Sequence, residues 1–478
     1  MKKDMTKGTE WKLILLFTLP IMAGNLLQQL YNTADNVIVG RLVSETAFSA
    51  VAVTAAPAFL FLAFSMGIAI GVGVVISQLF GARQHEKLAV AVDTSVILLG
   101  LLGITVMVIG WIITPWLLGT VLSVPDALLD YAIPYMRAYC VGMPFQFVYN
   151  GIAAILRGVG DSKSSLFFLL ITAVLNIFLD IAAIYLVSDP IAQTAGTAWA
   201  TVISQVVCVV ISYIYMRRRL DFGKATKHFD GKICGTILKI GLPTAIQQSI
   251  VSLGSLAMQR LVNGFSDDAL IAAYGAGSRL NNFAFVPIIG FQSGLANFTG
   301  QNIGANRLDR VKRGYRATLV MGLAATVIIC VAIYVFATPL VELFGLAGDS
   351  VRIGVEQVKF LSTWYWFFSL YMLLGGVLQG AGDTVLQSAA TLIALAIRVV
   401  VGYIGVHFGF LGYAAAWNTL PMGWAAAAII TQIRYFTGGW KKKAIAKRAP
   451  EEEAQEPDIT HELAEATASA SSPEGTGE

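Results

Sequence analysis

The chain has 478 residues and a formal net charge of +4, and 56% of its residues are hydrophobic while only 13% are charged. A soluble domain carries about 25% charged residues, so this composition excludes a water-soluble globular protein and indicates one whose solvent is the lipid bilayer. Stretches such as 96–113 are apolar on every side. They therefore exclude the alternating strands of a membrane β-barrel and predict helices.

Hydropathy and helix breakers predict an all-α integral membrane protein with about 12 transmembrane helices. In chain order, the predicted spans cover residues 11–39, 46–80, 88–112, 128–157, 162–188, 193–216, 233–263, 268–302, 314–337, 351–380, 384–407 and 410–436. The first of them is too long for the apolar region of a signal peptide, so we interpret it as a span. Residues 438–478 form a tail that is first basic and then acidic, without aromatic residues from 449 onward. Such a composition predicts disorder.

Lysine and arginine gather on one set of the loops. They occur in 1–12, 83–87, 157–163, 217–232, 307–313 and 441–448, whereas the opposite loop 113–127 has none. By the positive-inside rule, we expect both termini to lie in the cytoplasm. We also expect a multi-pass protein of the inner (plasma) membrane.

The two halves of the chain repeat each other. Leu19-Pro20 matches Leu242-Pro243 at an offset of 243 − 20 = 223, and Gly67, Gly71 and Gln78 match Gly290, Gly294 and Gln301 at the same offset. LRGVGD (156–161) likewise matches LQGAGD (378–383). Because six spans separate the copies, the two copies have the same orientation in the membrane. The sequence therefore predicts a lobe over 1–216, a cytoplasmic linker over 217–232 and a second lobe over 233–437.

Parallel repeats of this size favour a transporter that works by alternating access, in which two helical bundles rock about a shared cleft. The alternative from another class is a membrane scaffold that transports nothing. The sequence contains no phosphate-binding GxxxxGK[ST] motif and no HExxH or GxSxG motif, so an ATP-driven pump and an enzyme are not predicted.

Ionisable residues inside spans are costly and are candidates for function. Asp35 lies in the first span and Asp180 in the fifth, with Asn176 one helical turn before Asp180. A spacing of four residues places Asn176 and Asp180 on one face of the helix. The second repeat has Met258 and Gly402 at the matching places. We therefore predict that ion coupling depends on the N-terminal half, where a buried carboxylate would bind a proton or a cation.

A second group of polar residues is predicted to line the substrate cavity. These residues are Gln29, Asn32, Gln146, Tyr149, Gln247, Gln248 and Arg398. Arg398 lies mid-span, where it contacts substrate, balances an acid or braces neighbouring carbonyls. The tenth span adds an aromatic cluster over 364–371, which suits organic cations if it faces the cavity. The histidines and cysteines are scattered, so no metal site is predicted.

The ordered set of motifs resembles the multidrug and toxic compound extrusion (MATE) family, in its bacterial DinF-like branch. The resemblance rests on LPIMAGNLLQQLYNTADNVIVGRL, on SQLFGARQ and GQNIGANR, on LRGVGD and LQGAGD, and on LNIFLD followed by AGTAWATVISQ. It implies two six-helix lobes around a V-shaped cleft and a secondary active exporter of amphipathic, often cationic, organic compounds.

The same resemblance implies site residues and a coupling ion. Asp35, Asn176 and Asp180 take the places of the family's acidic cluster, and Thr201 matches a threonine that joins it. The ion is H⁺ or Na⁺. Where some relatives carry a glutamate in the seventh helix, this chain has Gln247-Gln248. We expect no cofactor and no nucleic-acid partner. We expect the protein to be a monomer in the lipid bilayer. A lipid-linked oligosaccharide flippase of the same wider superfamily is the alternative transporter.

Overall fold

The computed structural model describes residues 4–219, 225–409 and 411–446, without the side chains of 32–37 and 219. Helices make up nearly all of this part of the chain, and it contains no strand. The all-helical prediction is thereby confirmed. Most of the predicted disordered tail lies outside the described residues, as does the middle of the predicted linker.

Helices α1 to α7 form the N-terminal lobe. They are α1 (Glu10–Leu42), α2 (Glu45–Gly81), α3 (His85–Trp116), α4 (Asp126–Val141), α5 (Met143–Gly158), α6 (Ser162–Leu186) and α7 (Pro190–Arg219). Helices α8 to α15 form the C-terminal lobe. They are α8 (Gly231–Asn263), α9 (Asp268–Gly304), α10 (Leu308–Val335), α11 (Ala337–Glu342), α12 (Asp349–Ser362), α13 (Tyr365–Gly380), α14 (Thr384–His407) and α15 (Ala415–Thr437).

Within the described ranges, 7 helices are long and apolar enough to cross a membrane, or up to 9 if each of two bent helix pairs is one span. The remaining long helices, α8, α9 and α15, have the length of a span but are less apolar. Together these elements correspond to the twelve spans predicted from the sequence. The two-lobe membrane fold is therefore as expected.

Two of the predicted spans are broken, although the sequence predicts continuous helices over 128–157 and 351–380. The structure bends the first by 45° between α4 and α5, and the second by 50° between α12 and α13. Pro144 follows the first break, and proline has no N–H for the preceding turn. The second break, at Thr363–Trp364, has no proline beside it, so the two copies share the bend but not its local cause.

The repeated motif at 156–161 and 378–383 forms the turn that starts α6 and α14. Gly160 has φ 88° and Gly382 has φ 83°, a left-handed conformation that favours glycine. The aspartate that follows is held by the last helix of its lobe. Tyr215 donates a hydrogen bond of 2.9 Å to Asp161, and Arg434 donates one of 2.6 Å to Asp383.

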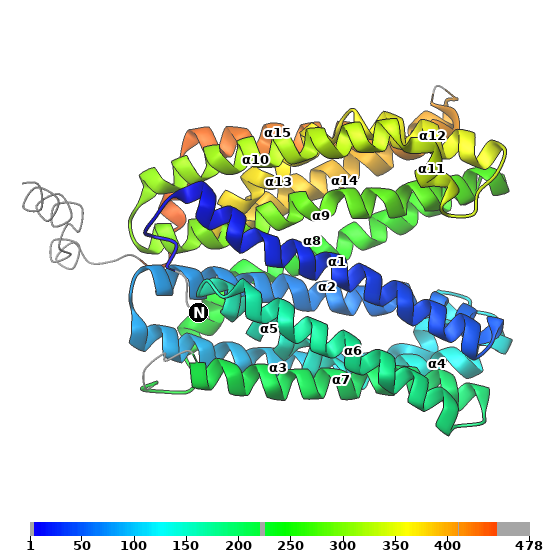
Figure 1. Ribbon diagram of the computed structural model, residues 1–478, viewed down its shortest axis with the longest axis horizontal. Coiled ribbons are helices and arrows are strands. Elements are labelled where there is room, and N and C mark those ends of the chain that lie inside the picture. Colours follow the sequence, from blue (N-terminus) through cyan, green and yellow to red (C-terminus); the bar gives the residue numbers. More distant parts are fainter. Residues whose placement is uncertain (1–3, 220–224, 410, 447–478) are drawn as a thin grey trace, which may run out of the picture.

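The helices run along the long axis of the molecule in two groups (Figure 1). Helices α3, α5, α6 and α7 lie on one side, helices α10, α13, α14 and α15 lie on the other, and α1, α2, α8 and α9 lie between them. The main contacts between the lobes are those of α2 with α8 and α9, and of α1 with α9.

The repeated glycines of α2 and α9 allow these close contacts. A Cβ atom at Gly67 would lie 2.2 Å from the Cα of Ala245 on α8. Its repeat partner Gly290 faces α1, where a Cβ atom would lie 2.5 Å from the Met22 side chain. Larger side chains at these positions would push the lobes apart. The repeat detected in the sequence is thus, in part, a repeat of interlobe contacts.

Two buried glutamines join the lobes at the end of the bundle that carries the basic loops. Gln78 of α2 donates to the carbonyl of Gly380 at 2.9 Å, and Gln301 of α9 donates to the carbonyl of Gly158 at 2.9 Å. Each therefore reaches into the opposite lobe. The glutamines are repeat partners, and so are the two glycines. We call these four residues the interlobe clasp.

The chain segments outside the spans complete the clasp. The Met5 N–H donates to Gln301 Oε1 at 2.9 Å, and the Ile445 N–H donates to Gln78 Oε1 at 2.7 Å. Both glutamines are fully buried, and the bonds to Gly380, Gly158 and Met5 are buried with them.

Replacing Gln78 and Gln301 together by alanine is expected to shift the protein away from this clasped state. Each substitution removes two hydrogen bonds, and leaving a buried partner unsatisfied costs about 1–3 kcal/mol. Distances between spin labels at Glu86→Cys and Asp309→Cys, two exposed positions next to the clasp, should become longer and broader. An unchanged distance distribution would show that the clasp does not hold the lobes together.

Candidate functional site: an interlobe cavity and a buried carboxylate cluster

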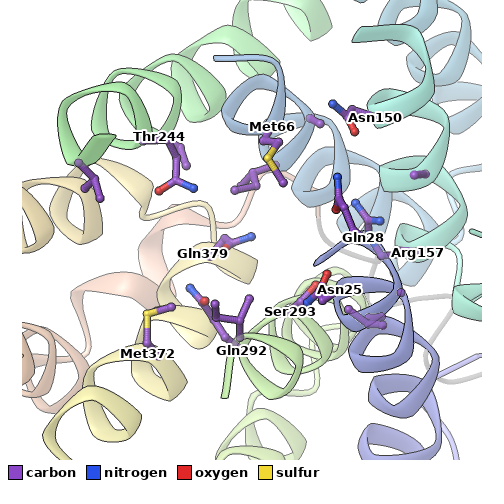
Figure 2. A pocket seen from close by; sticks show the side chains of 18 of the residues that line it. Asn25, Gln28, Met66, Asn150, Arg157, Thr244, Gln292, Ser293, Met372 and Gln379 are labelled. Carbon is purple, nitrogen blue, oxygen red and sulfur yellow. The ribbon is translucent and has the colours of Figure 1, made fainter. Parts of the chain in front are cut away.

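A cavity of about 540 Å³ lies between the lobes, which is within the usual size of small-molecule sites. Helices α1, α2, α5, α6 and α7 of the N-terminal lobe line it together with α8, α9, α13, α14 and α15 of the other lobe. Figure 2 shows polar side chains from both lobes converging on this space. A compound bound here would contact both halves of the molecule.

Five of the predicted cavity residues line this space. They are Gln146, Tyr149, Gln247, Gln248 and Arg398. Gln29 is half-buried on α1 and is not among the lining residues, and the side chain of Asn32 lies outside the described residues. Asn25 and Gln28 present the amides of α1 to the cavity instead.

Several lining amides are held in place by hydrogen bonds within their own lobe. Gln205 donates to Gln146 at 2.6 Å. Gln247 donates to Thr391 at 2.9 Å and accepts from Ser388 at 2.8 Å. These bonds orient the amides, so their remaining donors and acceptors offer a polar surface to a substrate.

The C-terminal lobe contributes the aromatic part of the wall. Phe368, Tyr371 and Trp424 line the cavity, and Phe285 stacks behind Phe368 with ring centroids 4.1 Å apart. Of the predicted aromatic cluster over 364–371, Phe368 and Tyr371 line the cavity and the other aromatic residues do not. The stacked rings provide a rigid apolar surface for the body of an organic compound.

Arg157 lines the cavity, although its position in the sequence assigns it to a basic loop. We grouped it with the basic loops because it precedes a loop by only a few residues, but the structure puts it on the cavity wall near the end of α5. The signal was its position in a repeated motif, where the second copy has Gln379, which also lines the cavity. A matched pair of long polar side chains at the ends of two spans points to a shared surface.

The predicted carboxylate cluster forms in the N-terminal lobe. Asn176 and Asp180 are both fully buried on α6. In the orientation that satisfies both ends of the Asn176 amide, its nitrogen donates to Asp180 Oδ2 at 2.9 Å and its oxygen accepts from the Thr201 N–H at 3.2 Å. The structure thus brings Asn176, Asp180 and Thr201 together. The side chain of Asp35 lies outside the described residues, so its place in this cluster stays a prediction.

The carboxylate cluster does not line the cavity. The residues that line the cavity include Ala173 of α6, one turn from Asn176, but neither Asn176 nor Asp180. The carboxylate is therefore beside the substrate space rather than in it. Among the described residues, no group of three or more histidine, cysteine and acidic side chains that could hold a metal ion is found.

The fold and the site define a class of protein: a two-lobe helical membrane transporter with a substrate cavity between repeated bundles. The MatE family model matches residues 20–182 and again residues 243–404, one match in each lobe. The chain belongs to the MatE family. It is an integral membrane protein, and the proteins of this family are transporters rather than enzymes.

Relatives and solved structures agree with this assignment. The chain is 27% identical over 451 residues to the probable multidrug resistance protein YoeA of Bacillus subtilis, covering 92% of this chain and 96% of that protein. It is 25% identical over 431 residues to the multidrug export protein MepA of Staphylococcus aureus, covering 87% and 91%. A solved MOP superfamily transporter from Pyrococcus furiosus shares the fold with a TM-score of 0.84 at 23% identity, covering 92% of this chain and 98% of that one.

Proposed function

We propose that this protein is a secondary active multidrug exporter, which moves amphipathic organic compounds out of the cell by antiport with H⁺ or Na⁺. The observation that carries the proposal is the cavity of about 540 Å³ with an amide-rich and aromatic lining shared by both lobes. The two relatives named above are called multidrug resistance and multidrug export proteins. A DinF-like position within the family stays a prediction.

The interlobe clasp supports alternating access as the mechanism. Its bonds connect Gln78 and Gln301 to backbone carbonyls of the opposite lobe at one end of the bundle. Opening that end requires these bonds to break while each lobe keeps its own core. A second state open at the basic end would then expose the same cavity to the other side of the membrane.

The coupling ion would act at the carboxylate cluster of the N-terminal lobe. A fully buried carboxylate is stabilised by a proton or a bound cation, and Asn176 and Thr201 place neutral oxygens beside Asp180. Binding or release of the ion would change the relative stability of the two lobe arrangements. In the C-terminal lobe, Met258 and Gly402 occupy the places that match Asp35 and Asp180, and the cavity wall carries Gln247 and Gln248 rather than an acid.

The proposal includes a location and an assembly state. Basic loops at one end of the bundle favour a cytoplasmic position for both termini in the inner (plasma) membrane. The cavity lies within one chain, so a monomer would suffice. The lipid-linked oligosaccharide flippase remains the second candidate, because the charged residues found among the described cavity lining are arginines, which would suit the phosphate of a lipid carrier.

The test is gradient-driven transport by the purified full chain in proteoliposomes. We expect an imposed pH or sodium gradient to drive uptake of fluorescent amphipathic dyes, and expect that collapsing the gradient stops it. The accessibility of a Thr226→Cys variant reports the orientation of the reconstituted protein. If correctly oriented, folded protein moves dyes of neither charge under either gradient, the proposal is wrong.

A further inference from the structure

The described part of the cavity lining carries positive charge. It includes Arg157 and Arg398 but no aspartate, glutamate, lysine or histidine. The other polar residues there are chiefly amides, which can accept or donate hydrogen bonds but carry no charge. Among these described residues, a cationic compound would meet two like charges and no opposite charge.

Neither arginine has an acidic partner in the described part of the chain. Among the described residues, no carboxylate lies within salt-bridge distance of Arg157 or Arg398. Arg398 donates one hydrogen bond, of 3.2 Å, to the Tyr274 hydroxyl, and its buried Nε has no partner among those residues. A cation removed from bulk water is stabilised by an opposite charge, which a ligand would have to supply.

The two arginines lie at different depths. Arg157 is one residue from the end of α5, whereas Arg398 is 14 residues from the start of α14 at the same end of the bundle. With a rise of about 1.5 Å per residue, they are roughly 20 Å apart along the bundle axis. One small acidic group cannot contact both, so one of them must be its main partner.

Arg157 has the better surroundings for an acidic group. A small recess at the base of the cavity is lined by Arg157, Gln379, Ser293, Asn297 and Ser77. Asn25, Gln28 and Ser293 line the same cavity as Arg157, and Gln379 lines it from the other lobe (Figure 2). A guanidinium with neighbouring amide and hydroxyl donors is the arrangement that recognises carboxylate, sulfonate or phosphate oxygens.

The aromatic wall of the cavity suits the apolar body of such a molecule. Phe368, Tyr371 and Trp424 face the same cavity, and Tyr371 is 8 residues before Gln379 on α13, or about 12 Å further along that helix. An acidic head at Arg157 would therefore leave an aromatic or aliphatic body beside the aromatic wall.

We propose that the base of the interlobe cavity binds the acidic head group of an amphipathic organic anion, with Arg157 as its charge partner and Gln379 as its partner from the opposite lobe. This inference rests on the proposed export function and names its substrate class. The exported compounds are organic acids rather than the organic cations that the sequence suggested. Because Arg157 and Gln379 belong to opposite lobes, the bound head group also contacts both moving halves.

The test compares two fluorescent probes with the same dansyl ring system, dansylglycine with its carboxylate and a dansyl amide with a trimethylammonium group. Equilibrium binding to the purified full chain in nanodiscs needs no ion gradient, so its result is independent of the transport test. We expect dansylglycine to bind more tightly than the cationic probe. Arg157→Gln should weaken dansylglycine binding by about tenfold or more, the usual effect of losing one hydrogen-bonded charge.

The repeat provides the matched variants. Glutamine already occupies position 379, which corresponds to 157 in the second copy, so Arg157→Gln should fold. Adding Gln379→Arg to it moves the cation to the opposite wall and should restore much of the lost affinity. Arg260→Gln removes a charge from an exposed position on α8 that does not line the cavity, and it should leave binding unchanged.

Three results would overturn the inference. They are tighter binding of the cationic probe by the wild type, binding of dansylglycine that does not respond to Arg157→Gln, and binding of neither probe. The first two leave the export function intact. Competition by short-chain phosphatidylglycerol, against phosphatidylcholine as control, distinguishes a lipid phosphate from a free organic acid as the source of the anionic head.

Discussion

Replacement of Asp180 by asparagine is expected to abolish concentrative, gradient-driven efflux while leaving a folded protein. Asp180 is fully buried beside Asn176 and Thr201. Asparagine keeps an oxygen that can accept from Asn176, but it can neither bind a proton at physiological pH nor offer a negative charge to Na⁺. Coupling free energies are typically about 1–3 kcal/mol, or about 5–150-fold in an equilibrium, and this variant should lose that factor.

The decisive measurement separates coupling from translocation. In proteoliposomes, Asp180→Asn should still exchange labelled for unlabelled substrate at equal concentrations. An imposed pH or Na⁺ gradient should no longer drive it to accumulate substrate. We expect the same of Asp35→Asn. Gln247→Ala serves as the control, since it removes hydrogen bonds to Thr391 and Ser388 without removing a charge. Wild-type gradient dependence in Asp180→Asn would show that this aspartate only supports packing.

The second large effect is expected at the close contact between the ends of α2 and α9. A Cβ atom at Gly81 would lie 1.9 Å from the carbonyl oxygen of Gln301, and one at Gly304 would lie 2.0 Å from the carbonyl oxygen of Gln78. Such distances are far inside van der Waals contact, and each obstacle is backbone of the opposite lobe. Gly81→Ala or Gly304→Ala should therefore prevent the clasped state, so that the lobes stay apart at this end and transport stops.

A matched control for Gly304→Ala lies on the same helix, α9. At Gly275, a Cβ atom would meet no described atom within 4 Å, and Gly275 lines neither the cavity nor its basal recess, so Gly275→Ala should transport at close to the wild-type rate. Spin-label distances between Glu86→Cys and Asp309→Cys should lengthen in Gly81→Ala and stay unchanged in Gly275→Ala. A normal transport rate in Gly81→Ala would mean that the clasped state is not part of the transport cycle.

The clasp glutamines and the neighbouring contact glycines, Gly81 and Gly304, act by different physical means. Gln78 and Gln301 stabilise the contact through hydrogen bonds, so their loss should change the populations of the two states gradually. Gly81 and Gly304 permit the contact sterically, so any side chain there removes the clasped state altogether. Comparing the two kinds of variant would show how much of the transport cycle depends on the stability of this state.

The sequence by itself determined the helical membrane fold, the spans and the duplication. These features can be recognised without a structure. A long run of apolar residues forms a helix in lipid, and a constant offset between motifs is a property of the sequence itself. It also placed Asn176 and Asp180 on one face of α6, because a spacing of four residues fixes that relation within a single helix. The approach of Thr201 was implied only by the resemblance to a family.

Only the tertiary structure decided which residues meet across the lobes and which faces the helices turn to the cavity. Neighbouring helical residues point about 100° apart, so a small rotation of α1 presents Asn25 and Gln28 to the cavity rather than Gln29. Arg157 could equally have pointed toward the basic loops, and it lines the cavity because α5 is bent away from α4 and packs against α2 and α3. The clasp joins Gln301 to Gly158 and Gln78 to Gly380. The members of each pair are 143 and 302 residues apart in the chain. They meet only because the two lobes pack together, and the periodicity of a single helix carries no information on that packing.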